Sequence, residues 1–187
     1  MSPLRRIVRG VSPWIVLWLS APLGGLIAFV ALGPTLDIGS AFAGGALIGL
    51  AIGAAQAWAL KRPFPRWMVA SAIGLAIGNA FSVAIVDALP APVDVLLGAA
   101  VAGALLGTAQ AIAGAPLHPA LWIPLISLGW SVAWGVSLVF AIDARQGFGI
   151  FGASGSLVFT ALLAITVHLA ARRRPAAAVV LPAGAVR

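Results

Sequence analysis

The chain has no cysteine and very little charge. Only 8% of its 187 residues are charged, against about 25% in an average soluble domain. Without cysteine there is no disulfide framework, no thiolate metal site and no cysteine nucleophile. Without enough polar surface to cover a folded domain in water, the composition excludes a soluble globular protein and indicates a membrane protein.

The few ionisable residues also limit the chemistry. None lies in the middle of a long apolar run, so a proton relay or a voltage sensor is not expected. No cluster of His, Asp or Glu suggests a metal centre, and we expect no cofactor. The segment "GASGS" resembles the serine motif of rhomboid proteases, but neither histidine is placed to form a dyad with Ser154. The pattern favours a protein that is not an enzyme, and its dispersed charge of +7 does not suggest a nucleic-acid partner.

Six apolar runs reach the length of about 20 residues that a helix needs to cross a bilayer. They cover residues 11–32, 38–60, 67–89, 93–115, 119–142 and 149–171, and the breaks between them contain proline, glycine or charge. The sequence therefore predicts an all-α membrane protein, a six-transmembrane-helix bundle that forms one domain over residues 1–174. Residues 175–187, "PAAAVVLPAGAVR", form a low-complexity tail.

The charge pattern predicts an orientation. With six spans, every basic residue except Arg145 falls on one side, and all four acidic residues fall on the other. The positive-inside rule then places both termini in the cytoplasm, and we expect the bacterial cytoplasmic (inner) membrane. Asp87 and Asp94 flank a predicted external turn and are expected to be solvated. Tryptophans near the cytoplasmic ends suit the lipid–water boundary; these are Trp14, Trp58, Trp67 and Trp122.

A repeat is visible inside the chain. A Gly-x-x-x-Gly-x-x-Gln run occurs in the second span and again in the fourth, and a Trp-x6-Gly run follows each, with a single residue inserted in the second connection. The first copy contains Gly49, Gly53, Gln56, Trp67 and Gly74, and the second contains Gly103, Gly107, Gln110, Trp122 and Gly129. Trp18 and Gly25 show the same Trp-x6-Gly spacing. The sequence predicts helical-hairpin repeats in parallel orientation, two copies with the sixth span as a degenerate third.

Each glycine run ends in a glutamine on the same helix face, because residues at three- and four-residue spacing align. The expected packing residues are Gly45, Gly49, Gly53, Gly103 and Gly107, since small residues let two helices approach closely in lipid. Two interpretations of Gln56 and Gln110 remain open. They form interhelical hydrogen bonds that lock the seam, or they are ligand-binding amides in a shallow site that opens to the cytoplasm. Asn79 completes this candidate polar seam or ligand site.

The stretch "GLAIGAAQ", followed by basic residues and "RWMVASAIGLAIG", resembles small polytopic bacterial membrane proteins of unknown function. The resemblance covers about residues 44–135 and implies a fold without an activity. In size and topology the chain also resembles the substrate-capturing membrane subunits of energy-coupling-factor transporters.

Two functions follow from these patterns as hypotheses. The first is a non-enzymatic accessory or scaffold subunit that packs through glycine-rich seams, in contact with lipid and with a membrane-protein partner or a second copy of itself. The alternative is a permease or substrate-capture subunit for a neutral or apolar small molecule, bound near Gln56, Gln110 and Asn79. A polar cavity that reaches the glutamines would favour the second.

Overall fold

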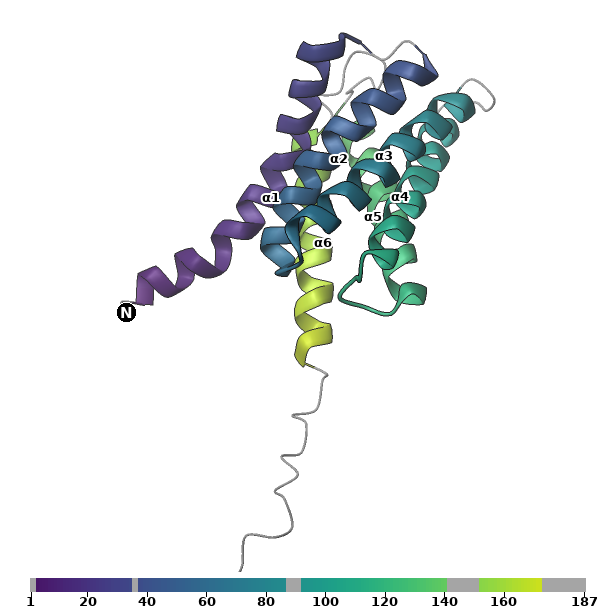
Figure 1. The fold of residues 1–187 in the computed structure, drawn as a ribbon. Coiled ribbons are helices and arrows are strands. Elements are labelled where there is room, and N and C mark those ends of the chain that lie inside the picture. Colours follow the sequence, from purple (N-terminus) through teal and green to yellow (C-terminus); the bar gives the residue numbers. More distant parts are fainter. Residues whose placement is uncertain (1–2, 35–36, 87–91, 141–151, 173–187) are drawn as a thin grey trace, which may run out of the picture.

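The computed structural model describes residues 3–34, 37–86, 92–140 and 152–172, and these residues form six α-helices and no strand (Figure 1). The helices are α1 (Pro3–Leu32), α2 (Ile38–Leu60), α3 (Phe64–Val86), α4 (Val93–Ile112), α5 (Pro119–Val139) and α6 (Gly152–Arg172). Each is long and apolar enough to cross a membrane, which confirms the predicted all-α, six-span fold. Asp87, Asp143, Arg145 and the tail 175–187 lie outside the described residues.

Several helix boundaries differ from the predicted spans. The third helix begins at Phe64 rather than at residue 67, because Pro65 falls in its first turn, where the missing N–H would have no helical partner in any case. The fourth helix ends at Ile112 rather than at residue 115. Gly114 follows with a φ of +94°, a left-handed conformation that glycine adopts without strain and that a helix cannot contain.

The ends of α2 are fixed by specific hydrogen bonds. Ser40 N donates to Asp37 Oδ1 at 2.8 Å, and Asp37 N donates to Ser40 Oγ at 3.2 Å, which is a capping box. At the other end Lys61 has a φ of 53°, and Arg62 N donates to Ala57 O at 2.8 Å. This left-handed turn stops the helix one turn after Gln56.

The six helices form a closed ring (Figure 1). Each helix packs against its neighbours in the sequence, and α6 packs against α1; no other pair of helices described here has its backbones in contact. Because successive helices run in opposite directions, the first residues of α1, α3 and α5 share one end of the ring with the last residues of α2, α4 and α6. We call it the basic end, since it carries Lys61, Arg62, Arg66 and Arg172. The opposite end, with Asp37 and Asp94, is the acidic end.

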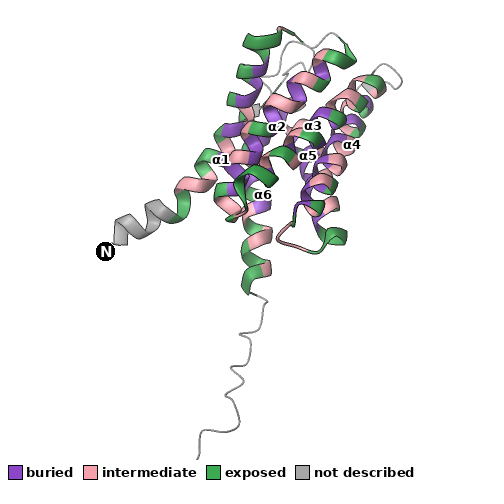
Figure 2. Ribbon diagram, viewed as in Figure 1, coloured by how far each residue is buried: buried purple, intermediate pink, exposed green. Residues whose placement is uncertain are grey.

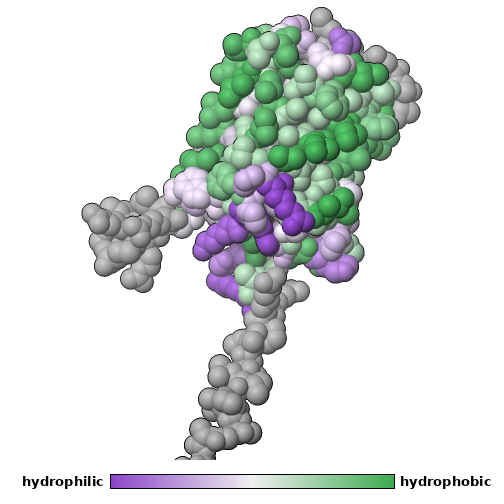
Figure 3. Space-filling view, in the orientation of Figure 1, coloured by the Kyte–Doolittle hydropathy of each residue, from purple (hydrophilic) through white to green (hydrophobic). Residues whose placement is uncertain are grey.

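The outward surface of the ring is apolar. Buried residues lie along the faces where the helices meet (Figure 2), whereas every helix has large hydrophobic side chains exposed on its outside; Val30, Ile112 and Val139 are among the most exposed. Hydrophilic side chains gather where α2 ends and α3 begins, and the body of the molecule is hydrophobic (Figure 3). Such a surface suits lipid rather than water, as expected for a multi-pass membrane protein.

Glycines bring the backbones of adjacent helices together. In α2, Gly45, Gly49 and Gly53 face α3, and in α4, Gly103 and Gly107 face α5. A Cβ atom added at Gly49 would lie 2.6 Å from the Cα of Ala72, and one added at Gly103 would lie 2.8 Å from the Cα of Ser127. No larger residue fits such an approach, which maximises dispersion contacts between helices in lipid. All five glycines therefore pack helices of this same chain against one another.

Candidate functional site

The two glutamines meet inside the ring near its basic end. Gln56 of α2 and Gln110 of α4 are both completely buried. Gln110 Nε2 donates a hydrogen bond to Gln56 Oε1 at 2.5 Å. The two helices have no backbone contact with each other, because α3 lies between them in the ring. The glutamine side chains thus connect helices that are not neighbours.

Each glutamine also accepts a hydrogen bond from a buried tryptophan. Trp67 Nε1 of α3 donates to Gln56 Oε1 at 3.3 Å, and Trp122 Nε1 of α5 donates to Gln110 Oε1 at 3.2 Å. Both indoles are completely buried, and their rings meet edge to face with centroids 6.0 Å apart. In both cases the donor lies on the helix that directly follows the glutamine.

Ser71 of α3 is the fifth member of this group, which we call the amide cluster: Gln56, Trp67, Ser71, Gln110 and Trp122. Gln110 Nε2 also donates to Ser71 Oγ, at 3.0 Å. The amide nitrogen of Gln110 thus serves two acceptors, and its oxygen serves one indole donor. Since buried polar groups are costly without partners, these contacts give both polar atoms of the Gln110 amide at least one partner.

Only one of the two polar atoms of the Gln56 amide has hydrogen-bond partners among the described residues. Its oxygen must face Trp67 and Gln110, because a reversed amide would turn its own donor toward two other donors. In that orientation its Nε2 is buried and has no hydrogen-bond partner among the described residues. A buried donor without a partner costs about 1–3 kcal/mol, so this atom is the energetic weak point of the cluster.

Of the predicted candidate site residues, the structure brings Gln56 and Gln110 together but not Asn79. Asn79 is half-buried on α3, two helical turns beyond Ser71, which corresponds to about 12 Å along the helix axis. None of the hydrogen bonds of the amide cluster reaches it. We expected Asn79 to complete the polar group with the two glutamines, and Ser71 does so instead.

Neither glutamine has any exposed surface, which favours the packing interpretation over a shallow ligand site that opens at the basic end. Two other expectations are wrong. Trp67 and Trp122 do not lie at the lipid–water boundary, because both are completely buried. Asp94 is not solvated: it is 2% exposed, in the first turn of α4, where its Oδ1 accepts from Val95 N at 2.7 Å. The positive end of the α4 dipole favours a carboxylate there.

The sequence carried a signal for the missed members of the cluster. Each glutamine is followed by a tight turn and then by a tryptophan, after 11 residues in one case and 12 in the other. A tryptophan that only marked the membrane boundary would not need a fixed distance from a glutamine. The two pairs differ by the single residue inserted in the α4–α5 connection.

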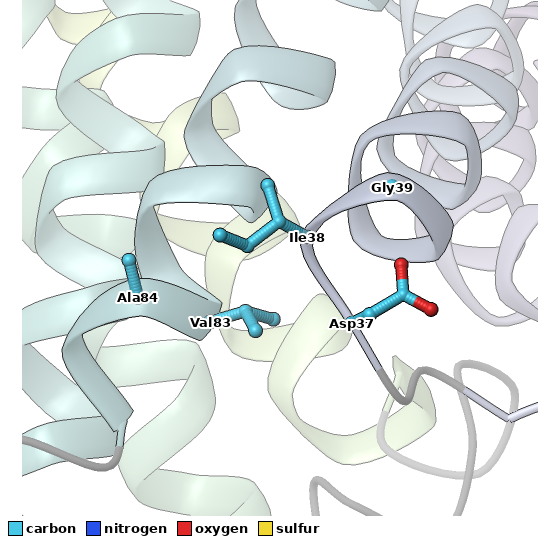
Figure 4. A pocket seen from close by; sticks show the side chains of 5 residues that line it. All are labelled: Asp37, Ile38, Gly39, Val83 and Ala84. Atoms are coloured by element: carbon cyan, nitrogen blue, oxygen red, sulfur yellow. The ribbon is translucent and has the colours of Figure 1, made fainter.

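A shallow, open hollow lies at the acidic end, far from the amide cluster. It is lined by Asp37, Ile38, Gly39, Val83 and Ala84 (Figure 4). Its only charged lining residue, Asp37, already caps α2. From Ile38 to Gln56 the distance along α2 is about 27 Å. The hollow is therefore separate from the glutamines.

The histidines take simple structural positions. Both are exposed, and His118 Nδ1 accepts from Ala120 N at 3.3 Å as the N-cap of α5. Within the described ranges no three His, Cys, Asp or Glu side chains lie close enough to share a metal ion. In searches of protein-family models, curated proteins and solved structures, nothing matches this chain.

Proposed function

We propose that this chain is a non-enzymatic integral membrane protein that serves as an accessory or scaffold subunit. The observation that carries the proposal is the internal hydrogen bonding of the amide cluster: the two glutamines bond to each other, to two indoles and to a serine. A ligand-binding amide would keep its polar atoms accessible. These amides hold helices together instead.

The glycine seams support the same proposal in a modified form. Because the seam glycines pack α2 against α3 and α4 against α5 within one chain, they shape the subunit and do not serve as its docking surface. A partner in the bilayer would contact the apolar outer faces of the helices. The proposed role is therefore that of a pre-formed, rigid subunit.

We further propose that the basic end faces the cytoplasm of a bacterial inner membrane. Lys61, Arg62, Arg66 and Arg172 share that end of the ring, and Arg5, Arg6 and Arg9 lie in the first turns of α1. Cytoplasmic loops of membrane proteins carry an excess of such residues.

This orientation can be tested with single cysteines, because the natural chain has none. In intact cells a membrane-impermeant maleimide should label Asp37→Cys and should label Arg172→Cys only after lysis. The reverse pattern would show that the basic end faces outward.

A second function, a permease or substrate-capture subunit, has one observation in its favour. The buried Nε2 of Gln56 has no partner among the described residues, so one donor in the amide cluster would be available to a neutral solute that entered the ring. The double variant Gln56→Leu/Gln110→Leu distinguishes the two functions. Loss of subunit assembly or stability is expected for a scaffold. Loss of solute uptake by a protein that still folds and assembles would instead identify a permease.

The partner itself is best identified by purification from the native membrane in mild detergent, followed by mass spectrometry. A membrane protein that co-purifies with the natural chain and is lost from the double variant would support the scaffold proposal. Thr108→Val is a matched control, because the Thr108 hydroxyl is exposed and bonds only to Ala104 O of its own helix. Recovery of the chain alone, in a form that takes up a solute, would contradict the proposal.

A further inference from the structure

The two amide–indole pairs define how the first two hairpins of the ring are related. Gln56 accepts from Trp67, and Gln110 accepts from Trp122. The even shift is the number of residues from Gln56 in α2 to Gln110 in α4, both even-numbered helices. The odd shift is the number of residues from Trp67 in α3 to Trp122 in α5, both odd-numbered helices. The odd shift is the longer of the two because it includes the residue inserted in the α4–α5 connection.

The glycine contacts of α2 with α3 recur between α4 and α5. A Cβ at Gly49 would meet the carbonyl oxygen of Ser71, and a Cβ at Gly103 would meet the carbonyl oxygen of Ile126 at 2.8 Å. The even shift leads from Gly49 to Gly103, and the odd shift leads from Ser71 to Ile126. Position by position, the two hairpins make equivalent contacts.

The contacts of α3 with α4 recur between α5 and α6. Gly74 lies against Leu106, and Gly129 lies against Phe159. The odd shift leads from Gly74 to Gly129, so Phe159 is the counterpart of Leu106. We call the step from Leu106 to Phe159 the second even shift. It places α6 in register with α4.

A second pair of contacts gives the same register. Gly78 of α3 lies against Ala102 of α4, and Gly155 of α6 lies against Ala133 of α5. In the first pair the glycine belongs to an odd-numbered helix, and in the second pair it belongs to an even-numbered helix. The positions in contact are nevertheless equivalent. The odd shift leads from Gly78 to Ala133, and the second even shift leads from Ala102 to Gly155.

The seam between α6 and α1 closes the series. The second even shift leads from Gly103 to Ser156. Gly103 lies against the carbonyl of Ile126, and Ser156 Oγ donates to the carbonyl of Trp18 at 3.0 Å. Trp18 therefore lies beside α6 as Ile126 lies beside α4.

The same register places Leu163 where α2 and α4 have their glutamines, since the second even shift leads from Gln110 to Leu163. Leu163 is 1% exposed and belongs to the hydrophobic core, so its position is as deep as those of Gln56 and Gln110. The third even helix thus presents a leucine to the centre of the ring.

The two amides are two members of a three-membered cycle, and the hydrogen bond between them is one of its three hydrogen bonds. Gln110 donates to Gln56, so under the threefold order a residue at 163 would donate to Gln110 Oε1 and accept from Gln56 Nε2. Gln56 Nε2 is the amide donor of the cluster that has no partner among the described residues. Gln110 Oε1 accepts only from Trp122 among the described residues, and a carbonyl oxygen can accept two hydrogen bonds.

We infer that α6 is the third copy of the hairpin repeat, that Leu163 occupies the position of a third glutamine, and that the free donor of Gln56 is the open end of a three-amide ring. This inference holds whether the chain is a scaffold or a permease. Among the even-numbered helices, α6 alone then has no glutamine at this position. The missing third glutamine explains why the donor of Gln56 is fully buried and has no partner among the described residues.

The variant Leu163→Gln tests the ring. A glutamine in place of a buried leucine normally destabilises a core, because its amide lacks partners. Here the new amide gains two hydrogen-bond partners, so the melting temperature of the purified protein should rise by about 2–4 °C. Leu106→Gln, a completely buried leucine outside the glutamine positions, should lower it.

A double-mutant cycle and a distance measurement complete the experiment. In a Gln56→Leu background the gain from Leu163→Gln should disappear. Melting of Leu163→Gln at or below the natural temperature, or a variant that does not fold, would overturn the three-amide ring. A short bismaleimide should join cysteines placed at 56 and 163 as readily as cysteines at 56 and 110, with the exposed position of Leu169 as the control. No reaction between 56 and 163 would overturn the threefold register.

Discussion

Gln110 donates a hydrogen bond to Gln56 over 2.5 Å, although the backbones of the helices that carry them are not in contact. The two side chains meet beside α3, and Ser71 of α3 accepts a further hydrogen bond from Gln110. Two hairpins are thereby joined by a contact that neither could make alone. Because hydrogen bonds depend on direction, this contact also fixes how α2 and α4 are rotated about their own axes.

The two glutamines should differ in their contribution to stability. Gln110→Leu removes three hydrogen bonds and leaves the buried Trp122 indole without an acceptor. Gln56→Leu removes two hydrogen bonds and leaves the Trp67 indole without an acceptor, but it also removes a donor that has no partner among the described residues. We expect a loss of about 1–3 kcal/mol in the free energy of unfolding for Gln110→Leu, and a smaller loss for Gln56→Leu.

Reversible unfolding in a mixed detergent measures this order. Thr108→Val is the matched control in α4, because it removes only a hydrogen bond to the helix's own backbone at an exposed position. Equal losses for the two glutamine variants would show that the free donor of Gln56 carries no cost.

The two tryptophans should also be unequal. Trp122→Phe keeps an aromatic ring but leaves Gln110 Oε1 without its indole donor, whereas after Trp67→Phe the oxygen of Gln56 still accepts from Gln110. Thermal melting should therefore fall further for Trp122→Phe. Trp58→Phe is the control, because Trp58 is 46% exposed and takes no part in the cluster. A control variant that melts as low as Trp122→Phe would contradict a specific role for the buried indoles.

The seam glycines should not tolerate even one methyl group. Gly49→Ala would bring a Cβ to within 2.6 Å of the Ala72 Cα, and overpacking of this kind costs about 1–3 kcal/mol. Gly10→Ala, with no atom within 4 Å of the added Cβ, should be neutral or slightly stabilising because alanine favours the helix. Detergent-solubilised yield and melting temperature distinguish the two. Equal yields and melting temperatures for the two variants would show that the helices can separate at this seam without loss of stability.

Most of the fold was predictable because its determinants are local. Apolar runs of membrane-spanning length, broken by proline, glycine and charge, define six helices, and the described helices agree in number and order. The boundary at Phe64 was missed because Pro65 was treated as a breaker, when a proline in the first turn starts a helix equally well. Sequence patterns determine where helices lie more securely than where they begin.

The candidate site was predictable only in part. Gln56 and Gln110 were identified because a repeated amide in apolar sequence requires a partner. Their indole partners were not, because an interfacial and a buried tryptophan look alike in sequence; helix rotation decides between them. Asn79 was wrongly grouped with the glutamines since polarity alone gives no depth. The contact between α2 and α4 depends on the closed ring, which no local pattern encodes.

Arg66 should hold the end of α4 at the basic end of the ring. Its Nη2 donates to the carbonyl oxygen of Ile112, the last residue of that helix, at 2.7 Å. Terminal carbonyls have no partner within a helix, and the negative end of the helix dipole favours a cation. Arg66→Ala should therefore speed amide hydrogen exchange in the last turn of α4 and cost about 0.5–1 kcal/mol. Arg62→Ala, which removes the same charge from the neighbouring turn, should leave that exchange unchanged. If both variants accelerate exchange in α4 equally, the effect comes from net charge at the basic end rather than from the hydrogen bond.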